Sequence, residues 1–351
     1  MKIIQTRKIW SVEQIPDREQ TRIEFPHLIR FKGSWYCAFR EGRIHMNHPS
    51  GRCRVIRSSD GERWESVALF DWDGGDVRET RLSVTAENRL MANTSIFFVS
   101  SEPREIGYSS KGAPYESYYQ LDKNGTPEDD LECNVARQSM SWLSADGSHW
   151  GDAHACHTGI NNWRWDVIWY NGMGYSIGYA GKDREGTLYR TRDGKNWRVL
   201  TRGFFPEGRG NEASLVFGGD GTAWCLLRGG PSPAMIGIGE PPYYQHWKWR
   251  HTTIALDEKD RPYVASKDFF SGDLGGPKMI LLQDGSLLGA GRANGRVTLF
   301  RIDPEKAILT KCLELDGTSY PGLVEHEQDV WVTYGVGAAS EIHLARVRRE
   351  M

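Results

Sequence analysis

Two histidines lie close together in a stretch whose composition is typical of a loop. His45 and His48 stand in "RIHMNHPSG", shortly after Glu41. An unperturbed imidazole titrates near ~6.5, so histidine is well suited to exchange protons around neutral pH. An exposed loop histidine without a chemical role is the alternative interpretation. Two of them beside Glu41, and opposite Glu24, favour a proton-transfer site.

One short corner occurs three times. "RSSDGERWES" at 57–66 is followed by "LSADGSHWGD" at 143–152 and "RTRDGKNWRV" at 190–199. A hydroxyl residue, Asp-Gly and Trp recur at the same offsets, whereas a two-residue hairpin requires only the Asp-Gly. The Asp can accept hydrogen bonds from the turn's own backbone, the Gly permits unusual dihedrals, and the Trp packs between strands. We therefore interpret the corner as a structural clip and not as a catalytic motif.

The composition favours an all-β fold with many tight turns. The 351 residues include 39 glycines, 14 tryptophans and 14 tyrosines. A chain of this length can bury roughly three quarters of its unfolded surface. The net charge is −2 with both signs interleaved, so there is no basic stripe for nucleic acid. No apolar run approaches the length of a membrane span. The sequence thus predicts neither nucleic acid nor a membrane as a partner.

The N-terminal residues and the cysteines predict a cytoplasmic protein. "MKIIQTRKIWSVEQIP" is basic but lacks the continuous apolar stretch of a secretory signal. The cysteines show neither CxxC nor metal-ligand spacing, and several stand in strand-like runs where a buried thiol acts as a small apolar residue. They are Cys37, Cys53, Cys133, Cys156, Cys225 and Cys312. We expect reduced thiols, no metal and no other cofactor; a disulfide in an exported protein is the alternative.

A strand–turn–strand unit repeats six times, which indicates a β-propeller. The units begin "FPHLIRFKG", "RLSVTAENR", "WDVIWYNGM", "EASLVFGGD", "GPKMILLQD" and "YPGLVEHEQ". A third and usually a fourth extended segment follow each unit, which makes a four-stranded meander of the roughly 40 to 50 residues in a propeller blade. The Asp-Gly corners then fall between the third and fourth strands of the first three blades. We expect residues 1–351 to form a single six-bladed domain.

The two ends of the repeat predict how the propeller closes. The last unit ends after "EIHLARVRR", one strand short of a blade, while "IIQTRKIWS" at 3–11 is a strand without a blade. Giving this N-terminal strand to the last blade leaves no open sheet edge. Residues 101–135 are polar and turn-rich, and are predicted to form a long loop inserted in blade two. Such a loop either covers a site or is a solvated excursion.

The three corners resemble the Asp-box repeats of sialidases, which are six-bladed propellers. The matching residues are Ser58, Asp60, Gly61 and Trp64, then Ser144, Asp146, Gly147 and Trp150, then Thr191, Asp193, Gly194 and Trp197. The Asp-to-Gly spacing is one residue shorter than in the fullest form of the repeat. The whole chain also resembles uncharacterised bacterial sialidase-like proteins with a "FREG…H" first blade and a "SYPGLV" last blade. In these the second blade carries a segment like "DVRETRLSVT".

The resemblance implies a site for an acidic sugar. "NEASLVFGGDGTAWCLLRGG" resembles the blade that supplies the catalytic glutamate and an arginine that binds the substrate carboxylate, which implies Glu212 and Arg228. "GAGR" and "TSYPGLVEHE" resemble the blades with the last such arginine and the nucleophilic tyrosine, which implies Arg292 and Tyr320. A sugar with its carboxylate at the reacting carbon repels a second carboxylate, which is a reason to use tyrosine as nucleophile.

Each of these four residues also has a structural interpretation. Tyr320 precedes Pro-Gly and could pack at a turn, and Glu212 could accept hydrogen bonds from amides at a strand start. Arg228 and Arg292 could pair with interior carboxylates. Because all four match in the family's order, the functional interpretation is favoured. Glu212 would take the phenol proton while the two arginines bind a substrate carboxylate.

Two departures from the sialidase pattern argue against ordinary sialic acid. "FPHLIRFKGSWYCAFREGR" resembles the first sialidase blade, with Arg43 in its final Glu-Gly-Arg, but Glu24 stands where the first triad arginine is expected. His45 and His48 stand where the acid/base aspartate is expected. We therefore predict an exo-glycoside hydrolase for another small acidic sugar, with His48 or His45 as the acid. The residues predicted to contact the substrate are Arg228, Arg292, Glu24, Arg43, Arg78 and Trp163.

Two other functions also fit the sequence. A lyase would remove a proton next to a uronate carboxylate, with an arginine neutralising that carboxylate and His48 or Tyr320 exchanging protons. A glycan-binding propeller would bind through its tryptophans without turnover, and the missing aspartate favours it. The Tyr-Glu-Arg-Arg set argues against it. Trp163 is the candidate sugar platform because it lies just before the third innermost strand, although propeller packing is the commoner role of such tryptophans.

Overall fold

The computed structural model of the protein describes residues 1–17, 20–45, 48–99, 135–179, 185–206, 211–229, 233–255 and 274–349. Strands dominate these ranges, and the helical structure in them is one short 3₁₀ turn, η1 (Val12–Gln14). None of the described residues forms a helix that is long and apolar enough to cross a membrane.

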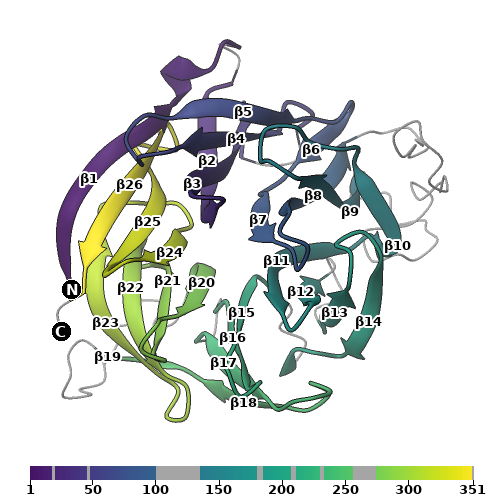
Figure 1. The fold of residues 1–351 in the computed structure, drawn as a ribbon, viewed down its shortest axis with the longest axis vertical. Coiled ribbons are helices and arrows are strands. Elements are labelled where there is room, and N and C mark those ends of the chain that lie inside the picture. Colours follow the sequence, from purple (N-terminus) through teal and green to yellow (C-terminus); the bar gives the residue numbers. More distant parts are fainter. Residues whose placement is uncertain are drawn as a thin grey trace. The chain divides into compact units, whose positions relative to one another are not determined.

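The strands form the six sheets of a six-bladed β-propeller, as the sequence predicts (Figure 1). Blade one contains β2 (Arg22–Phe31), β3 (Ser34–Gly42), β4 (Arg52–Ser58) and β5 (Glu65–Phe70). Blade two contains β6 (Gly75–Val77), β7 (Arg81–Val84), β8 (Leu90–Val99), β9 (Val135–Ser144) and β10 (His154–Ile160). Blade three contains β11 (Trp163–Tyr170), β12 (Met173–Tyr179), β13 (Thr187–Thr191) and β14 (Trp197–Arg202).

The remaining three blades follow in chain order. Blade four contains β15 (Ala213–Phe217), β16 (Ala223–Leu227), β17 (Met235–Gly239) and β18 (Trp247–His251). Blade five contains β20 (Gly275–Leu281), β21 (Leu287–Ala293), β22 (Arg296–Asp303) and β23 (Ile308–Leu315), with the short β19 (Thr253–Ala255) parallel to β23. Blade six contains β24 (Gly322–His326), β25 (Asp329–Val336), β26 (Glu341–Arg348) and the N-terminal β1 (Lys2–Ser11).

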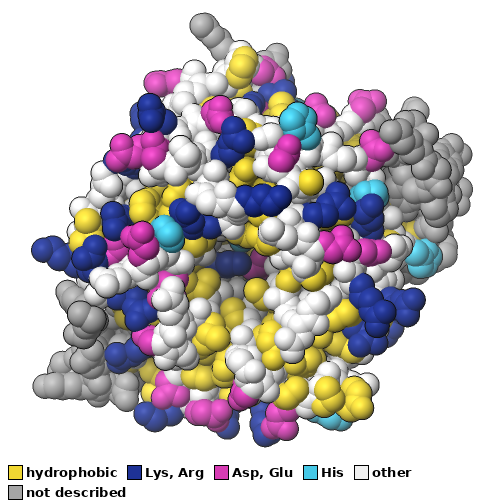
Figure 2. Space-filling view, in the orientation of Figure 1, with side chains coloured by type: hydrophobic (Ala, Val, Ile, Leu, Met, Phe, Trp, Pro, Cys, Tyr) yellow, Lys and Arg dark blue, Asp and Glu magenta, His cyan; other side chains and the backbone are white. Residues whose placement is uncertain are grey.

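The contacts divide the chain into two compact units. Unit 1 comprises Met1–Gln14, Ile23–Ile29 and Asn211–Met351, and unit 2 comprises Ile15–Arg22 and Arg30–Gly210. The expectation that residues 1–351 form a single domain stays a prediction. Over the face drawn in Figure 2, acidic and basic side chains are interspersed, as the charge pattern of the sequence indicates.

The N-terminal strand closes the last blade, which confirms the predicted closure. β1 runs antiparallel to β26, from the pair Lys2–Arg348 to the pair Ser11–Glu341. Both strands lie side by side in Figure 1. The added strand covers what would otherwise be the outer edge of β26, so the backbone groups of that edge are paired.

Alternate residues of the strands build the cores of the blades. In β25, Val330, Val332 and Tyr334 are buried in one cluster with residues of the neighbouring blade five, such as Leu288 and Leu299. Successive side chains of a strand point to opposite faces, so this spacing places all three on the same face. In unit 2 a comparable cluster includes the clip residue Trp197, which is 4% exposed.

The Asp-Gly corners are structural clips, as predicted. In the first corner, Asp60 Oδ1 accepts the backbone N–H groups of Glu62 at 2.8 Å and Arg63 at 2.9 Å. The Ser58 hydroxyl oxygen accepts the N–H of Gly61 at 2.8 Å, and Gly61 has a φ of 76° that favours glycine. These backbone donors hold the pKa of Asp60 well below its usual range.

The second and third corners repeat this geometry. Asp146 Oδ1 accepts the amides two and three residues later at 2.8 Å each, and Asp193 Oδ1 accepts the equivalent amides at 2.9 and 2.8 Å. All three corners join the third and fourth strands of their blades. Residues 101–134 of the predicted insertion lie outside the described residues, and residue 135 already belongs to β9.

The described cysteines carry free thiols. They are Cys37, Cys53, Cys156, Cys225 and Cys312, whereas Cys133 lies outside the described residues. Cys53 is fully buried, and this burial raises the pKa of its thiol to about 12. A thiol that stays protonated in the core packs as a small apolar group, which is the role expected from the sequence for cysteines in strands.

Candidate active site

Three of the predicted residues meet in unit 1. The Tyr320 hydroxyl donates a hydrogen bond to Glu212 Oε1 at 2.8 Å. Arg228 Nη1 donates to the same Oε1 at 3.0 Å and to the Tyr320 oxygen at 2.8 Å. A phenol, a carboxylate and a guanidinium group therefore form a closed triangle of hydrogen bonds, which we call the Tyr320 cluster together with Arg292.

Two neighbouring strands place the glutamate opposite the arginine. Glu212 stands immediately before β15, and Arg228 immediately after β16. These strands pair from Ala213–Leu227 onwards, and the N–H of Arg228 donates to the carbonyl oxygen of Glu212 at 2.9 Å. The hairpin thus continues by one residue pair beyond its strands. This explains why two residues sixteen positions apart can share one hydrogen-bonded triangle.

A glycine is required beside the tyrosine ring. The N–H of Gly276 donates to Glu212 Oε2 at 2.8 Å, so the second carboxylate oxygen is also held. Gly276 has a φ of 57°, and a Cβ atom at this position would lie 1.9 Å from Tyr320 Cγ. The sequence reasoning missed Gly276, although the pair of glycines in "DLGGPKM" is a signal for close approach of a backbone.

The ring of Tyr320 is held by two further contacts. The guanidinium carbon of Arg292 lies 5.6 Å from the ring centroid, within the range of a cation–π interaction. The ring of Phe25 packs at 5.0 Å with an interplanar angle of 50°. Phe25 has a φ of 61° and its N–H donates to the Ser319 hydroxyl oxygen at 2.9 Å, which fixes this ring next to the tyrosine.

The Tyr320 cluster is mostly buried but not sealed. Tyr320 and Glu212 are each 6% exposed, whereas the Arg228 side chain is 21% exposed. Glu24, the residue before Phe25, is buried as well. A carboxylate therefore stands on the strand where the resemblance implies a third arginine, and its predicted contact with substrate stays a prediction.

In unit 2, the loop of His48 fixes which ring nitrogen carries the proton. The N–H of Ser50 donates to His48 Nδ1 at 3.1 Å, and the Ser50 hydroxyl lies 2.7 Å from the same nitrogen. That hydroxyl oxygen accepts the N–H of Arg43 at 3.1 Å, which leaves its own hydrogen to donate to Nδ1. With two donors on Nδ1, the neutral ring carries its hydrogen on Nε2.

This assignment limits what His48 can do. A neutral imidazole with Nε2–H donates a hydrogen bond to a ligand oxygen. To act as an acid, the ring would first have to carry a second hydrogen, on Nδ1. The N–H of Ser50 points at this nitrogen and opposes that protonation. The arrangement thus favours a hydrogen-bond donor over a proton shuttle, and the role of His48 as acid stays a prediction of the sequence.

Asp76 is the centre of a buried ion cluster that the sequence reasoning missed. Its Oδ1 accepts Arg40 Nε at 2.9 Å, and its Oδ2 accepts Arg78 Nη1 at 3.3 Å and the N–H of His48 at 3.3 Å. The side chains of Asp76 and Arg40 are fully buried. Asp76 stands two residues before Arg78 in "DVRET", which is the signal that could have identified it.

The two arginines of this Asp76 cluster hold the histidine loop by its backbone. Arg40 Nη1 donates to the carbonyl oxygen of Ile44 at 2.9 Å, and Arg78 Nη1 donates to that of His45 at 2.6 Å. A Cβ atom at Gly51 would lie 1.7 Å from Asp76 Oδ1. Arg78 is 2% exposed in this arrangement and supports the loop, and its predicted contact with substrate stays a prediction.

Two of the other predicted residues of unit 2 lie at the protein surface. His45 and Arg43 are exposed. The sequence groups Glu41 with the histidines. In the structure, Arg54 binds both of the Glu41 oxygens at 2.8 and 3.0 Å, and Arg52 binds one of them at 3.1 Å. Two cations pull this buried carboxylate towards the neighbouring strand β4.

Trp163 is packed inside blade three. It is 7% exposed, its ring stacks on Tyr179 at 5.8 Å, and Trp165 meets it edge-on at 5.0 Å. Phe97 makes a further edge contact at 5.3 Å. Aromatic neighbours therefore occupy the surroundings of the ring, which is the packing role that tryptophans commonly have in a propeller.

The six sheets form a six-bladed β-propeller whose fold is similar to that of sialidases. A protein of unknown function from Dyadobacter fermentans has this fold, with a TM-score of 0.70 and 15% identity over 99% of both chains. The intramolecular trans-sialidase of Ruminococcus gnavus, in complex with oseltamivir carboxylate, follows with a TM-score of 0.65 and 13% identity over 99% of this chain and 98% of its own.

A third solved structure has a different activity on the same fold. The α-L-arabinofuranosidase Arb93A of Fusarium graminearum, in complex with an iminosugar inhibitor, has a TM-score of 0.63 and 10% identity over 99% of this chain and 98% of its own. No protein-family model matches the sequence. No curated protein matches it either. At these identities the similarity establishes the fold, whereas the function depends on the residues of the site.

Proposed function

We propose that the protein is an exo-glycoside hydrolase for a small acidic sugar other than ordinary sialic acid, with Tyr320 as nucleophile. The observation that carries the proposal is the hydrogen bond of 2.8 Å from the Tyr320 hydroxyl to Glu212, with Arg228 at 2.8 Å from the same phenol oxygen. A nucleophile activated by an adjacent base is the usual signature of covalent catalysis. Structural neighbours named as a trans-sialidase and an arabinofuranosidase support a glycosidase.

The first chemical step joins the tyrosine to the sugar. The Tyr320 oxygen bonds to the anomeric carbon while the bond from that carbon to the leaving oxygen breaks, and Glu212 takes the phenolic proton. The hydrogen bond from Arg228 favours the anionic phenol oxygen as it forms. Water then attacks the anomeric carbon, the bond to Tyr320 breaks, and Glu212 returns the proton to the phenol. The leaving oxygen needs a proton as well, and the attacking water must give up one of its own; a single acid/base group can serve both transfers, for which His48 or His45 remains the sequence prediction.

The charges of the site support an acidic sugar whose carboxylate is bound by two arginines. Arg228 and Arg292 both contact Tyr320, so two positive charges flank the proposed nucleophile. A carboxylate bound there meets planar pairs of donors. Glu24 stands where the resemblance implies a third arginine, so a sialate carboxylate would be bound by two arginines and not by three. Common sialosides should therefore be poor substrates.

The test is a mass-spectrometric screen of acidic glycosides with the wild-type protein. Hydrolysis adds water to the products, whereas a lyase produces an unsaturated uronate with its own ultraviolet absorbance. The expected result is hydrolysis of at least one carboxylated glycoside and little turnover of sialosides. Elimination products would replace the hydrolase proposal with a lyase, and no turnover of any acidic glycoside would contradict both.

A pair of variants ties the activity to the Tyr320 cluster. Glu212→Gln keeps the size of the side chain but removes the base, and should lower turnover by roughly 10² to 10⁴-fold, the usual range for proton transfer by a positioned side chain. Glu314→Gln makes the same change at a surface residue that pairs with Lys311 and should leave turnover unchanged. Equal activity of the two variants would contradict the role of Glu212.

A further inference from the structure

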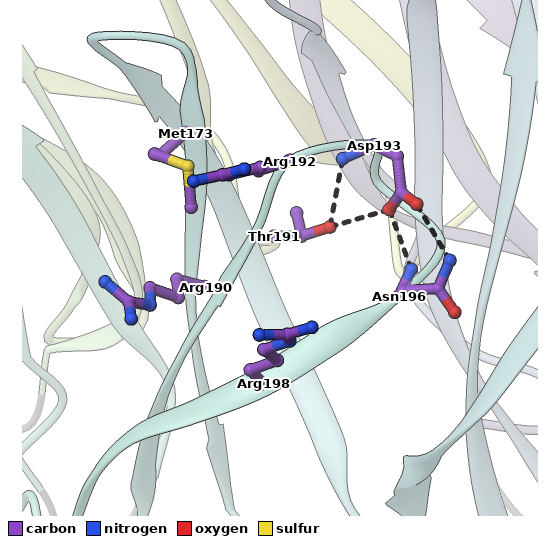
Figure 3. A pocket seen from close by; sticks show the side chains of 7 residues that line it. All are labelled: Met173, Arg190, Thr191, Arg192, Asp193, Asn196 and Arg198. Carbon is purple, nitrogen blue, oxygen red and sulfur yellow. Dashed lines mark hydrogen bonds between the residues drawn. The ribbon is translucent and has the colours of Figure 1, made fainter.

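The third Asp-box corner lines a hollow of about 570 Å³ with three arginines. Arg190, Arg192 and Arg198 border it together with Met173, Asp193 and Asn196 (Figure 3). The hollow lies within blade three, at the end where β13 turns into β14. Figure 2 shows a group of lysine and arginine side chains beside β14, at the right of that view. This is a locally basic surface on a chain whose net charge is −2.

The first and third corners differ in the charges of one pair of equivalent residues. The residue before the hydroxyl residue faces the residue after the tryptophan across the two strands. In the first corner these are Arg57 and Glu65, which form an ion pair at 2.5 Å. In the third corner the pair is Arg190 and Arg198. Like charges directly opposite each other on neighbouring strands repel, so the third corner lacks the neutralisation that the first provides.

No other group in the described part of the protein neutralises these arginines. Neither Arg190, Arg192 nor Arg198 forms an ion pair with a described carboxylate. Asp193 is close by, but its Oδ1 accepts the Thr191 hydroxyl and two backbone amides, and its Oδ2 accepts Asn196 Nδ2 at 2.8 Å. Although burial acts in the opposite direction, these hydrogen bonds lower the pKa of Asp193 to about 2. The carboxylate is thus committed to its own turn.

Arg192 adds a third charge that the other corners do not have. The residue at its position is Ser59 in the first corner and Ala145 in the second. The third corner therefore combines a repelling pair with a further cation around a hollow. The first corner forms an ion pair at the positions where the third corner has two opposed arginines. Such unrelieved repulsion is expected where a ligand supplies the missing negative charge.

We infer that this hollow binds an oxyanion, the sulfate, phosphate or carboxylate group of a ligand, between Arg190, Arg192 and Arg198. Each guanidinium group offers a planar pair of N–H donors that matches two oxygens of such a group. An anion between the opposed arginines replaces their repulsion with two attractions. The volume exceeds what a single inorganic ion fills, and so leaves room for a saccharide ring that carries the anion.

The inference does not depend on the proposed function, because no residue of the hollow belongs to the Tyr320 cluster. It is tested by isothermal titration calorimetry of the wild-type protein at low ionic strength. The probes are sodium sulfate, sodium phosphate and trigalacturonate, with neutral maltotriose for comparison. At least one of the three anions should bind, and maltotriose should not. Binding that weakens as sodium chloride is added is expected, because the contact is electrostatic.

Two variants with the same change in net charge locate the site. Arg198→Glu recreates the ion pair of the first corner and should weaken anion binding by about tenfold or more, the loss expected for one charge-assisted hydrogen bond. It should also raise the melting temperature in the absence of anions. Arg63→Glu changes an exposed arginine of the first corner, 92% exposed, and should bind anions like the wild type.

The outcomes that overturn the inference are distinct. They are no binding of any of the three anions, equal losses in both variants, or unchanged binding by Arg198→Glu. Trigalacturonate could also bind at the Tyr320 cluster, so Arg292→Ala is measured in parallel. Trigalacturonate binding that is lost in Arg292→Ala but kept in Arg198→Glu would also count against the hollow.

Discussion

The two units each contain a buried carboxylate bound by arginine, but the two carboxylates hold different things. Glu212 in unit 1 accepts the hydroxyl of Tyr320 and one nitrogen of Arg228. Asp76 in unit 2 accepts two arginines and a backbone N–H. The Arg228 side chain is 21% exposed, whereas Arg40 beside Asp76 is fully enclosed.

This difference separates the arrangement that we propose to be reactive from a supporting one. A carboxylate that accepts the proton of a hydroxyl group can take that proton during a reaction. A carboxylate that accepts only cations and a backbone amide neutralises buried charge and orders a loop. Arginine and acidic side chains of the same types therefore do not identify an active site by themselves. The further partner of the carboxylate, a hydroxyl group in one cluster and a backbone amide in the other, distinguishes the two. Changes at the two clusters should accordingly affect activity in one case and stability in the other.

The largest effect is expected for Tyr320→Phe. The ring and its contacts with Phe25 and Arg292 remain, but the oxygen proposed to attack the sugar is lost. Turnover should fall by about 10⁴-fold or more, the scale on which removal of a nucleophile acts. The measurement is the initial rate on the acidic glycoside that the screen identifies, with circular dichroism to check folding. A folded variant with unchanged rate would contradict the proposed nucleophile.

The next largest effect is expected for Asp76→Asn. The change leaves the charges of Arg40 and Arg78 buried without this carboxylate, and should destabilise the protein by about 3 to 5 kcal/mol. Urea unfolding measures the free energy. Asp303→Asn, at an exposed pair with Lys306, is the control and should cost under about 1 kcal/mol. Similar values for the two variants would mean that the Asp76 cluster does not support unit 2.

In unit 1, Gly276→Ala tests the close packing of the backbone against the Tyr320 ring. The new methyl group would overlap the Tyr320 ring, so the variant should lose about 1 to 3 kcal/mol through overpacking and should also lose turnover. Gly285→Ala is the matched control, because Gly285 also has a positive φ, 82°, but has no atom within 4 Å of the added carbon. Both variants carry the backbone strain. The difference between them therefore measures the contact with Tyr320, and equal stability and activity would argue against it.

The smallest effect is expected at Ser50, in the loop that the Asp76 cluster holds. Long-range ¹H–¹⁵N spectra of the wild type should show neutral His48 protonated on Nε2. Ser50→Ala removes one of the two donors to Nδ1, at a cost of about 0.5 to 1.5 kcal/mol, and should populate the other tautomer in part. His343, which bonds Glu341 through Nε2 at 2.7 Å, serves as the internal reference. A wild-type ring protonated on Nδ1 would reverse the assignment.

Most of the fold follows from local patterns. The six strand–turn–strand units, the three corners and the strand left over at the N-terminus are each recognisable within a few residues, because the period of a strand and the chemistry of a turn are local. The closure of β1 on β26 followed from counting strands. Only the fine structure escaped, such as the division of the first strand of blade two into β6 and β7.

The site is less accessible to sequence reasoning because its contacts are not local. Tyr320 and Glu212 are 108 residues apart, and only the resemblance to sialidases connected them. Asp76 was missed because its partner Arg40 is 36 residues away and no motif joins the two. Glu41 was grouped with the histidines because it is near them in the chain, whereas Arg52 and Arg54 take its oxygens from the next strand.

The pairing of β1 with β26 has a consequence for the synthesis of the protein on the ribosome. Lys8 and its partner Glu341 are separated by 333 positions, so β1 emerges long before the strand that it joins. Until then its N–H and C=O groups are available to other nascent chains, and the basic side chains of Lys2, Arg7 and Lys8 discourage such pairing. Elongation rate and chaperone supply, more than equilibrium stability, should therefore determine how much soluble protein a cell accumulates.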